Sequence, residues 1–129
     1  MNSFTQLFSE KKSFRKRQGV TEYQIKEAEK LLELEFSEEY KEYLIAFGAA
    51  SIYGHEFTGI CDAPRLNVVT VTKEEKEFNH FVPQEFYVIE QLNIDGVVIW
   101  QCKDGAVYQS IPNGTLEKIC ESLSEYIES

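Results

Sequence analysis

The stretch 86–111, FYVIEQLNIDGVVIWQCKDGAVYQSI, limits the possible folds more than any other part of the chain. It holds three short apolar runs, and an Asp-Gly pair (Asp95-Gly96, then Asp104-Gly105) lies in each of the two connections. Such a pair between apolar runs is a strong hairpin signal, because glycine adopts positive φ angles without a steric cost. The predicted structure is a three-stranded antiparallel meander with strands at 86–92, 97–102 and 106–111. Apolar residues alternate onto both faces of these strands, so we expect a sheet that is covered on both sides.

Helix signals precede the meander. The T-x-x-Q pattern beginning at Thr21 is a capping box and predicts a helix over 22–34. Ser37 is a good N-cap for a second helix over 38–47, which Gly48 would end. Residues 3–17 are amphipathic with a basic far end, which predicts a further helix before these two.

Two segments between the helices and the meander are shorter and less regular. Residues 50–61 predict two short strands around a turn at Gly54-His55. Within 67–78 the β-branched run favours a strand, whereas Thr72-Lys73-Glu74-Glu75 resembles a capped helix start. We expect a short helix from about residue 73.

After the meander, the chain has its most regular helical periodicity. Thr115 would cap a helix to about Glu128, with apolar residues at helical spacing, namely Leu116, Ile119, Cys120, Leu123 and Ile127. The expected fold class is therefore α+β, with N-terminal helices and a C-terminal helix packed on the antiparallel meander. At 129 residues, a single domain spanning 1–129 is the expectation.

Charge is distributed unevenly along the chain, although the net charge is −9. Residues 1–18 carry five basic side chains and one acidic one, whereas 19–129 carry eight basic and 21 acidic ones. A domain as acidic as residues 19–129 should repel nucleic acid and attract a basic partner. The alternative is that the acidic residues only keep the protein soluble. The sequence has no signal peptide pattern and no apolar run long enough for a membrane span, so we expect a cytoplasmic protein. We also expect it to be a monomer or a weak homodimer.

The residues do not assemble a recognisable active site. Cys61, Cys102 and Cys120 are widely separated and lie in apolar runs, which favours buried thiols over disulfides or a zinc site. His55 and His80 are the two histidines, and both lie in predicted turns or loops. Acidic pairs such as Glu38-Glu39 lie at helix starts, where they stabilise the helix dipole. We expect no enzymatic activity, no cofactor and no metal.

Residues 21–48, TEYQIKEAEKLLELEFSEEYKEYLIAFG, resemble the opening of the SUKH superfamily, which includes yeast cell-wall assembly regulators and many bacterial immunity proteins. The resemblance extends over about 20–128, through the strand pair, the Asn67-Val68-Val69 segment, the meander and the final helix. The chain departs from the family pattern where Phe36-Ser37 replaces Leu-Pro and where 47–51 replaces an Asn-Gly-Gly turn. The matching motif positions are Ile25, Glu29, Tyr40, Tyr43 and Leu44.

This resemblance implies a non-enzymatic protein that neutralises a cognate toxin by occlusion, the toxin being a nuclease or another intracellularly acting domain. A basic toxin would suit the acidity of residues 19–129. The expected contact residues lie in the strand-pair loop and the meander turns, namely Tyr53, His55, Glu56, Asp62, Asp95 and Asp104. Two alternatives stay open: a regulatory adaptor like the yeast members, and a small enzyme, which would require a pocket holding a titratable group of shifted pKa.

Overall fold

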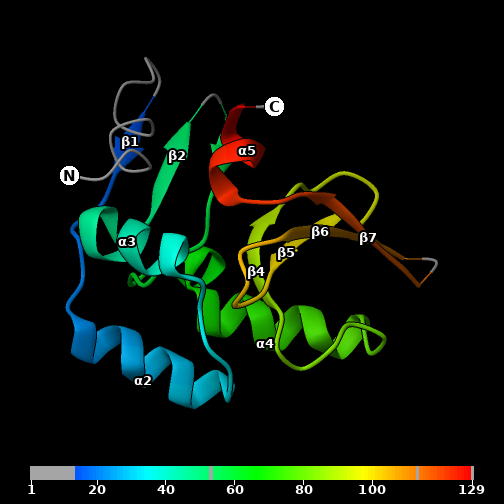
Figure 1. Cartoon of the computed structure of the whole chain (residues 1–129), viewed down its shortest axis with the longest axis horizontal. Helices are drawn as coiled ribbons and strands as arrows, with labels where there is room; N and C mark the ends of the chain where they lie inside the picture. Colours follow the sequence, from blue (N-terminus) through cyan, green and yellow to red (C-terminus); the bar gives the residue numbers. More distant parts are fainter. Residues whose placement is uncertain (1–13, 53, 113, 129) are drawn as a thin grey trace.

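The structure is a computed structural model that describes residues 14–52, 54–112 and 114–128. In chain order its elements are β1 (Arg15–Lys16), α2 (Glu22–Leu32), α3 (Glu38–Phe47), β2 (Ala50–Ile52), β3 (His55–Glu56), η1 (Pro64–Leu66), α4 (Val68–Phe78), β4 (Tyr87–Gln91), β5 (Val98–Gln101), β6 (Val107–Ile111), β7 (Thr115–Cys120) and α5 (Leu123–Glu128). Figure 1 shows α2 and α3 on one side of the molecule and the larger sheet on the other. The predicted α+β class is confirmed.

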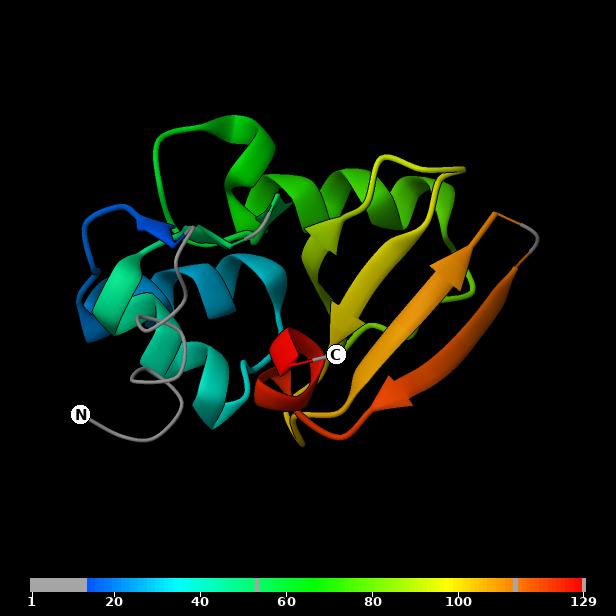
Figure 2. The same ribbon diagram turned by 90° about the horizontal axis from the view of Figure 1, so that it is seen from above.

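The strands form two antiparallel sheets. The smaller sheet has the order β1-β2-β3, and the larger sheet has the order β4-β5-β6-β7. The sheets meet where Phe57 bridges to Glu90 and where the Thr58 N–H donates to the Ile89 carbonyl at 2.9 Å. Seen from above, the β6–β7 hairpin extends away from the rest of the molecule, and α5 lies between the helices and the larger sheet (Figure 2).

The meander prediction is confirmed to within about a residue at each strand end. Both faces of β4 and β5 are buried, as the apolar pattern indicates. Tyr87, Ile89 and Ile99 face a core shared with α2 and α3, whereas Val88 and Trp100 belong to a second core with Val71 of α4.

The N-terminal caps are confirmed. Thr21 and Gln24 form the predicted capping box, and the Ser37 hydroxyl accepts a hydrogen bond from the Tyr40 N–H at 3.1 Å. Leu31 of α2 is three positions after the buried Ala28, a helical spacing that predicts a core position, but it is 56% exposed.

The prediction of one helix over 115–128 is wrong in its first half. Residues Thr115–Cys120 form β7, which extends the meander to four strands, and only Leu123–Glu128 are helical. The pairing of β7 with β6 shifts at Ile119, since Val107 pairs with Cys120 and Tyr108 with Lys118. A bulge of this kind interrupts the alternation of side chains between the two faces of a strand. The apolar residues of the edge strand β7 therefore have a helix-like spacing, which explains the wrong prediction.

Two further boundaries differ from the predictions. The helix expected from residue 73 begins at Val68, because the Asn67 side chain caps the N–H groups of Val69 and Thr70. The helix expected over 3–17 lies outside the described residues except at its end, where Arg15 and Lys16 form a strand instead.

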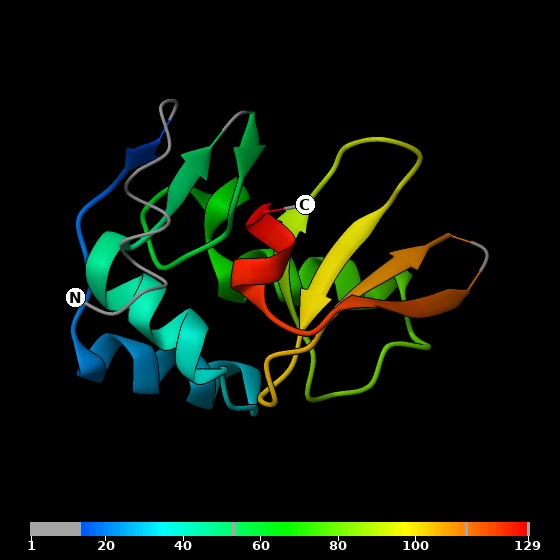
Figure 3. The same cartoon turned by 45° about the horizontal axis from the view of Figure 1, so that its top comes forward.

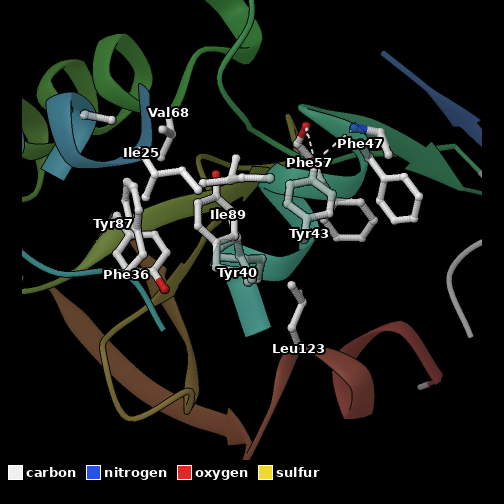
Figure 4. Close-up of a cluster of buried hydrophobic side chains, with 14 of the residues drawn as sticks. Ile25, Phe36, Tyr40, Tyr43, Phe47, Phe57, Val68, Tyr87, Ile89 and Leu123 are labelled. Atoms are coloured by element: carbon white, nitrogen blue, oxygen red, sulfur yellow. Dashed lines mark hydrogen bonds between the residues drawn. The ribbon is translucent and has the colours of Figure 1, made fainter. Parts of the chain in front are cut away.

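The core that positions the small sheet is built around buried tyrosines, whose rings cluster in Figure 4. The Tyr43 hydroxyl donates to the Thr58 carbonyl at 2.7 Å and accepts from the Ala50 N–H at 2.9 Å. The Tyr40 hydroxyl is 2.8 Å from the Thr58 hydroxyl. Burial raises the pKa of both phenols, so they remain neutral hydrogen-bonding groups. These bonds hold α3 against the segment that carries β2 and β3.

α5 is attached to α3 through one carboxylate. Glu39, in the first turn of α3, accepts hydrogen bonds from the Leu123 N–H at 2.7 Å and the Ser124 N–H at 3.1 Å. An acidic side chain at this position satisfies otherwise unpaired N–H groups at the start of α5. Leu123 is buried against the same core.

Candidate interaction surface

The β2–β3 hairpin brings two of the expected contact residues to the surface. His55 and Glu56 form β3 and pair with Ile52 and Ser51 of β2. Both are exposed, on a hairpin whose β2 strand is anchored by the Tyr43 hydroxyl. Tyr53, the expected contact residue in the same hairpin, lies outside the described residues.

Glu56 forms a two-pronged ion pair with Arg65 of η1. The guanidinium Nη1 and Nη2 donate to the two carboxylate oxygens at 2.7 and 3.0 Å. These hydrogen bonds lower the pKa of Glu56, so the carboxylate is ionised at neutral pH. Paired geometry of this kind fixes both side chains more firmly than a single contact would.

Asp62 lies on the neighbouring loop and is also near an arginine. Its carboxylate is 3.5 Å from Nη1 of Arg17, although the Asp62 side chain is 97% exposed. The expected contact residues Glu56 and Asp62 are therefore each paired with a cation, and the structure places both beside the small sheet.

His55 touches a buried carboxylate that the sequence pattern did not single out. Its Nδ1 is 2.8 Å from Oε2 of Glu90, which is 3% exposed. The other oxygen of Glu90 accepts a 2.5 Å hydrogen bond from the Tyr126 hydroxyl of α5. This carboxylate connects β3, β4 and α5. Burial, reinforced by Glu90, raises the pKa of Tyr126, which keeps its hydroxyl a donor.

Tyr126→Phe is expected to destabilise the protein by about 1–3 kcal/mol, because a buried carboxylate loses a hydrogen-bond donor. Phenylalanine keeps the ring that packs against His55 and Phe57. Urea unfolding followed by circular dichroism measures the change, with Tyr23→Phe on an exposed ring as the matched control. Equal midpoints for the two variants would show that the Tyr126–Glu90 bond contributes nothing.

The two meander turns lie far from each other. Asp95 is in the connection from β4 to β5 and Asp104 in the connection from β5 to β6, so they stand at opposite ends of β5. Figure 3 shows the β4–β5 connection on the same side as the β2–β3 hairpin and the β5–β6 connection on the other. Both residues are exposed.

Asp104 also has a local structural role. Its Oδ1 accepts hydrogen bonds from the Cys102 thiol at 3.0 Å and from the Ala106 N–H at 2.9 Å, and these bonds lower its pKa. Burial, with Asp104 nearby, raises the pKa of Cys102 to about 11, so this thiol stays protonated at neutral pH. Asp104 is therefore held by contacts within the β5–β6 connection itself.

The Glu56–Arg65 pair separates two shallow hollows. One, of about 100 Å³, lies between this pair and the end of β4, where Gln91 and Asn93 line it. The other lies toward β1. We call the region formed by the exposed residues His55, Glu56, Asp62, Arg65 and Asn93, together with the half-buried Gln91, the hairpin surface.

The remaining candidate chemistry is sparse in the part of the chain that the structure describes. There, no three His, Cys, Asp or Glu side chains lie close enough together to hold a metal ion. His80 is exposed. Of the cysteines, Cys102 is buried as expected, whereas Cys61 and Cys120 are partly exposed. None of the described helices combines the length and apolar character needed to cross a membrane.

Arg65, Glu90 and Tyr126 are the residues of this region that sequence reasoning missed. Arg65 follows Pro64 in an irregular segment. Tyr126 lies in a predicted helix, and its hydrogen-bond partner Glu90 is 36 positions away in the sequence. Glu90 does carry a signal, because a glutamate within an apolar strand that is covered on both sides must find hydrogen-bond donors.

Comparison with known proteins agrees with the resemblance in the sequence. The family model described as SUKH_5: SMI1-KNR4 cell-wall matches residues 1–129. A crystal structure of a protein from Pseudomonas syringae pv. tomato is similar, with a TM-score of 0.77 and 20% identity, covering 98% of this chain and 93% of that one. At this identity the likeness concerns the fold. No curated protein matches the chain significantly.

Proposed function

Because this chain belongs to the SUKH_5 family, SMI1-KNR4 cell-wall, we propose that it is an immunity protein that binds a cognate bacterial toxin and neutralises it by occlusion. The observation that carries this proposal is the family match over residues 1–129. The mechanism requires binding rather than catalysis: a folded surface covers the active or substrate-binding face of an intracellularly acting toxin domain, such as a nuclease.

The charge of the chain supports a basic partner. Residues 19–129 carry 21 acidic and eight basic side chains, so their field attracts a cationic protein from a distance. Complementary charge of this kind accelerates encounter and discriminates between partners. A nuclease domain has a cationic surface for its own substrate, which an acidic protein can compete for.

The hairpin surface is the proposed centre of the contact. It is exposed, yet its side chains are held by the Glu56–Arg65 pair and by the buried Glu90 beneath His55. Side chains that are already ordered lose less conformational entropy on binding, which favours affinity. The β4–β5 connection, which carries Asp95, lies on the same side of the molecule as the β2–β3 hairpin (Figure 3), so Asp95 is kept as a proposed contact. Asp104 is in the β5–β6 connection on the other side and is not included.

Co-expression tests the proposal directly. The proposal predicts that a large secreted-type toxin is encoded next to this chain, that cells expressing this toxin stop growing, and that co-expression of this chain restores growth. A stable complex should then be recovered from the rescued cells. Toxicity that this chain does not relieve would contradict the proposal.

The double charge reversal Glu56→Lys and Asp62→Lys is expected to weaken toxin binding about tenfold or more, mainly through slower association. The change removes two acidic groups facing a basic partner and also removes the carboxylate that orients Arg65. Surface plasmon resonance at two salt concentrations measures the rate and its screening.

The matched control is Glu74→Lys with Glu77→Lys, which makes the same change of net charge on the exposed face of α4. This control should lose only the long-range part of the attraction. If both double variants bind equally well, the hairpin surface is not the contact.

A regulatory adaptor is the second candidate, because the family description refers to cell-wall proteins of the SMI1-KNR4 type. Under this function the chain would dock on a cellular partner and no toxin would be encoded nearby. Recovery of one cellular protein with the wild-type chain, and not with the hairpin-surface variant, would favour the adaptor.

A further inference from the structure

A hollow of about 290 Å³ beside the hairpin surface has a charge opposite to that of the protein as a whole. We call it the basic hollow. It is lined by residues of β1, β2, β3 and η1 and by the residues next to β1 and β2, and its charged lining residues are Arg15, Lys16, Arg17, Glu56 and Arg65. Four of these side chains are cationic and one is acidic, in a chain with a net charge of −9.

The basic hollow keeps an excess of positive charge after its internal pairs are counted. Glu56 balances Arg65, and Asp62 partly balances Arg17 at a distance of 3.5 Å. Among the described residues, Arg15 and Lys16 have no acidic side chain within 4.0 Å. Because Arg15 and Lys16 are consecutive in β1 and point to opposite faces, a further anion in the hollow would meet at least one of these unneutralised cations.

Donor groups remain available on these cations. Arg65 uses two of its five N–H groups on Glu56, and its side chain is 65% exposed. Arg15 uses one N–H on the Phe14 carbonyl at 3.0 Å. A planar guanidinium with free N–H groups matches the two oxygens of a carboxylate.

The backbone beneath these cations is fixed. β1 pairs with β2 through Arg15–Ser51 and Lys16–Ala50, and the Arg17 N–H donates to the Ala49 carbonyl at 2.9 Å. The Ala50 N–H is already bonded to Tyr43. Because the main-chain groups of the floor are used within the fold, recognition depends on the side chains around it.

We propose that the basic hollow receives an acidic side chain, glutamate or aspartate, of the protein partner. This inference rests on the proposed function, in which that partner is a toxin. The interface then uses charges of both signs. The acidic field of residues 19–129 attracts a basic protein, and one carboxylate of that protein fixes its orientation by binding in the basic hollow.

The surrounding charge favours a single carboxylate over a polyanion. A nucleic acid presents a phosphate at every step of its backbone, so most of its charges would face the acidic remainder of this surface. An isolated carboxylate on a basic protein meets the local cations without that repulsion. It also supplies specificity, because a competing protein with a lysine at that position would be repelled.

Amide-resolved NMR of the full chain tests the hollow without the toxin. The probe is N-acetylglutamate amide, compared with its neutral glutamine analogue, inorganic phosphate and a short single-stranded DNA at constant ionic strength. We expect the glutamate probe to shift the amide signals of residues 15–17, 49–51 and 65–66. Its affinity should fall about tenfold in the double variant Arg15→Gln and Lys16→Gln.

The control Lys30→Gln with Lys73→Gln removes the same charge from exposed positions on α2 and α4 and should leave the shifts unchanged. The proposal is overturned if the glutamate and glutamine probes give the same shifts, or if both double variants behave alike. Tighter binding of phosphate would make the hollow a phosphate site, and binding of DNA through the same amides would make it a nucleic-acid site; either result overturns the assignment.

Co-expression separates this inference from the proposed function. Rescue of growth without binding of the glutamate probe would leave the immunity function standing and remove the hollow from it. Binding of the probe without rescue would show that the hollow binds a carboxylate but that the partner is not a toxin, which overturns the inference as stated. With rescue established, Arg15→Gln and Lys16→Gln should weaken the toxin complex about tenfold relative to Lys30→Gln and Lys73→Gln.

Discussion

Gly59→Ala is expected to destabilise the protein by at least about 3 kcal/mol, and in practice to leave little folded material. A methyl group added at Gly59 would lie 1.8 Å from the Gly48 carbonyl oxygen and 2.8 Å from the Cα of Ala49. Both are main-chain atoms, so no rotation of a side chain can relieve the two close contacts.

The backbone around Gly59 cannot shift freely to make room. The Gly59 N–H donates to the Leu66 carbonyl at 2.8 Å, and the Gly59 carbonyl accepts from the Val68 N–H at 2.7 Å. On the other side, the Gly48 carbonyl accepts from the Ile60 N–H at 2.9 Å. Moving the segment around Gly59 or the segment around Gly48 would break these hydrogen bonds. The loss of stability is therefore larger than that of a steric contact alone.

Gly54→Ala is the matched control. Gly54 has a φ of +85°, but a Cβ there would meet nothing within 4 Å, so only conformational strain of about 1–2 kcal/mol is expected. Thermal and urea unfolding of both variants give the comparison. A Gly59 variant with the melting temperature of the parent would show that the crossing of these segments is looser than described.

Trp100→Ala is expected to cost about 3–5 kcal/mol. The indole is fully buried between β5 and α4, in a core lined by Val71, Val88 and Val98. Its Nε1–H also donates to the buried Ser110 hydroxyl at 2.8 Å. Alanine would leave a cavity and would remove the hydrogen-bond partner of Ser110.

Trp100→Phe separates these two contributions, because phenylalanine fills most of the cavity but has no N–H donor. It should cost clearly less than alanine. Since the chain has one tryptophan, unfolding of these variants must be followed by far-ultraviolet circular dichroism rather than by indole fluorescence. An alanine variant no less stable than Phe78→Ala, which truncates a side chain that is 81% exposed, would contradict the prediction.

The parts of the fold that were predicted correctly are those governed by local chemistry. Capping at Thr21 and Ser37 and the two Asp-Gly turns depend on residues a few positions apart, and each was found where the pattern placed it. The helix over 115–128 failed because the bulge at Ile119 depends on pairing with β6, which no local pattern contains. Likewise, Asn67 outweighed the β-branched run that follows it.

The candidate surface follows the same division. That His55, Glu56 and Asp62 lie in exposed turns was predictable from the turn residues around them. Their partners Glu90, Arg65 and Arg17 lie between nine and 45 positions away in the sequence, and only the tertiary fold brings them together. The basic residues 15–17, expected at the end of a helix, line a hollow instead, and Arg15 and Lys16 among them form β1 by pairing with β2.

The attachment of α5 has a consequence for protein synthesis. Glu39 binds the N–H groups of Leu123 and Ser124, and Glu90 binds the Tyr126 hydroxyl. While the ribosome is still adding residues 123–126, both carboxylates are synthesised but lack these donors. A nascent chain therefore cannot complete this core until residues 123–126 have been added. A chain that stops before residue 123 would leave Glu39 and Glu90 without these donors and would leave the buried position of Leu123 unfilled.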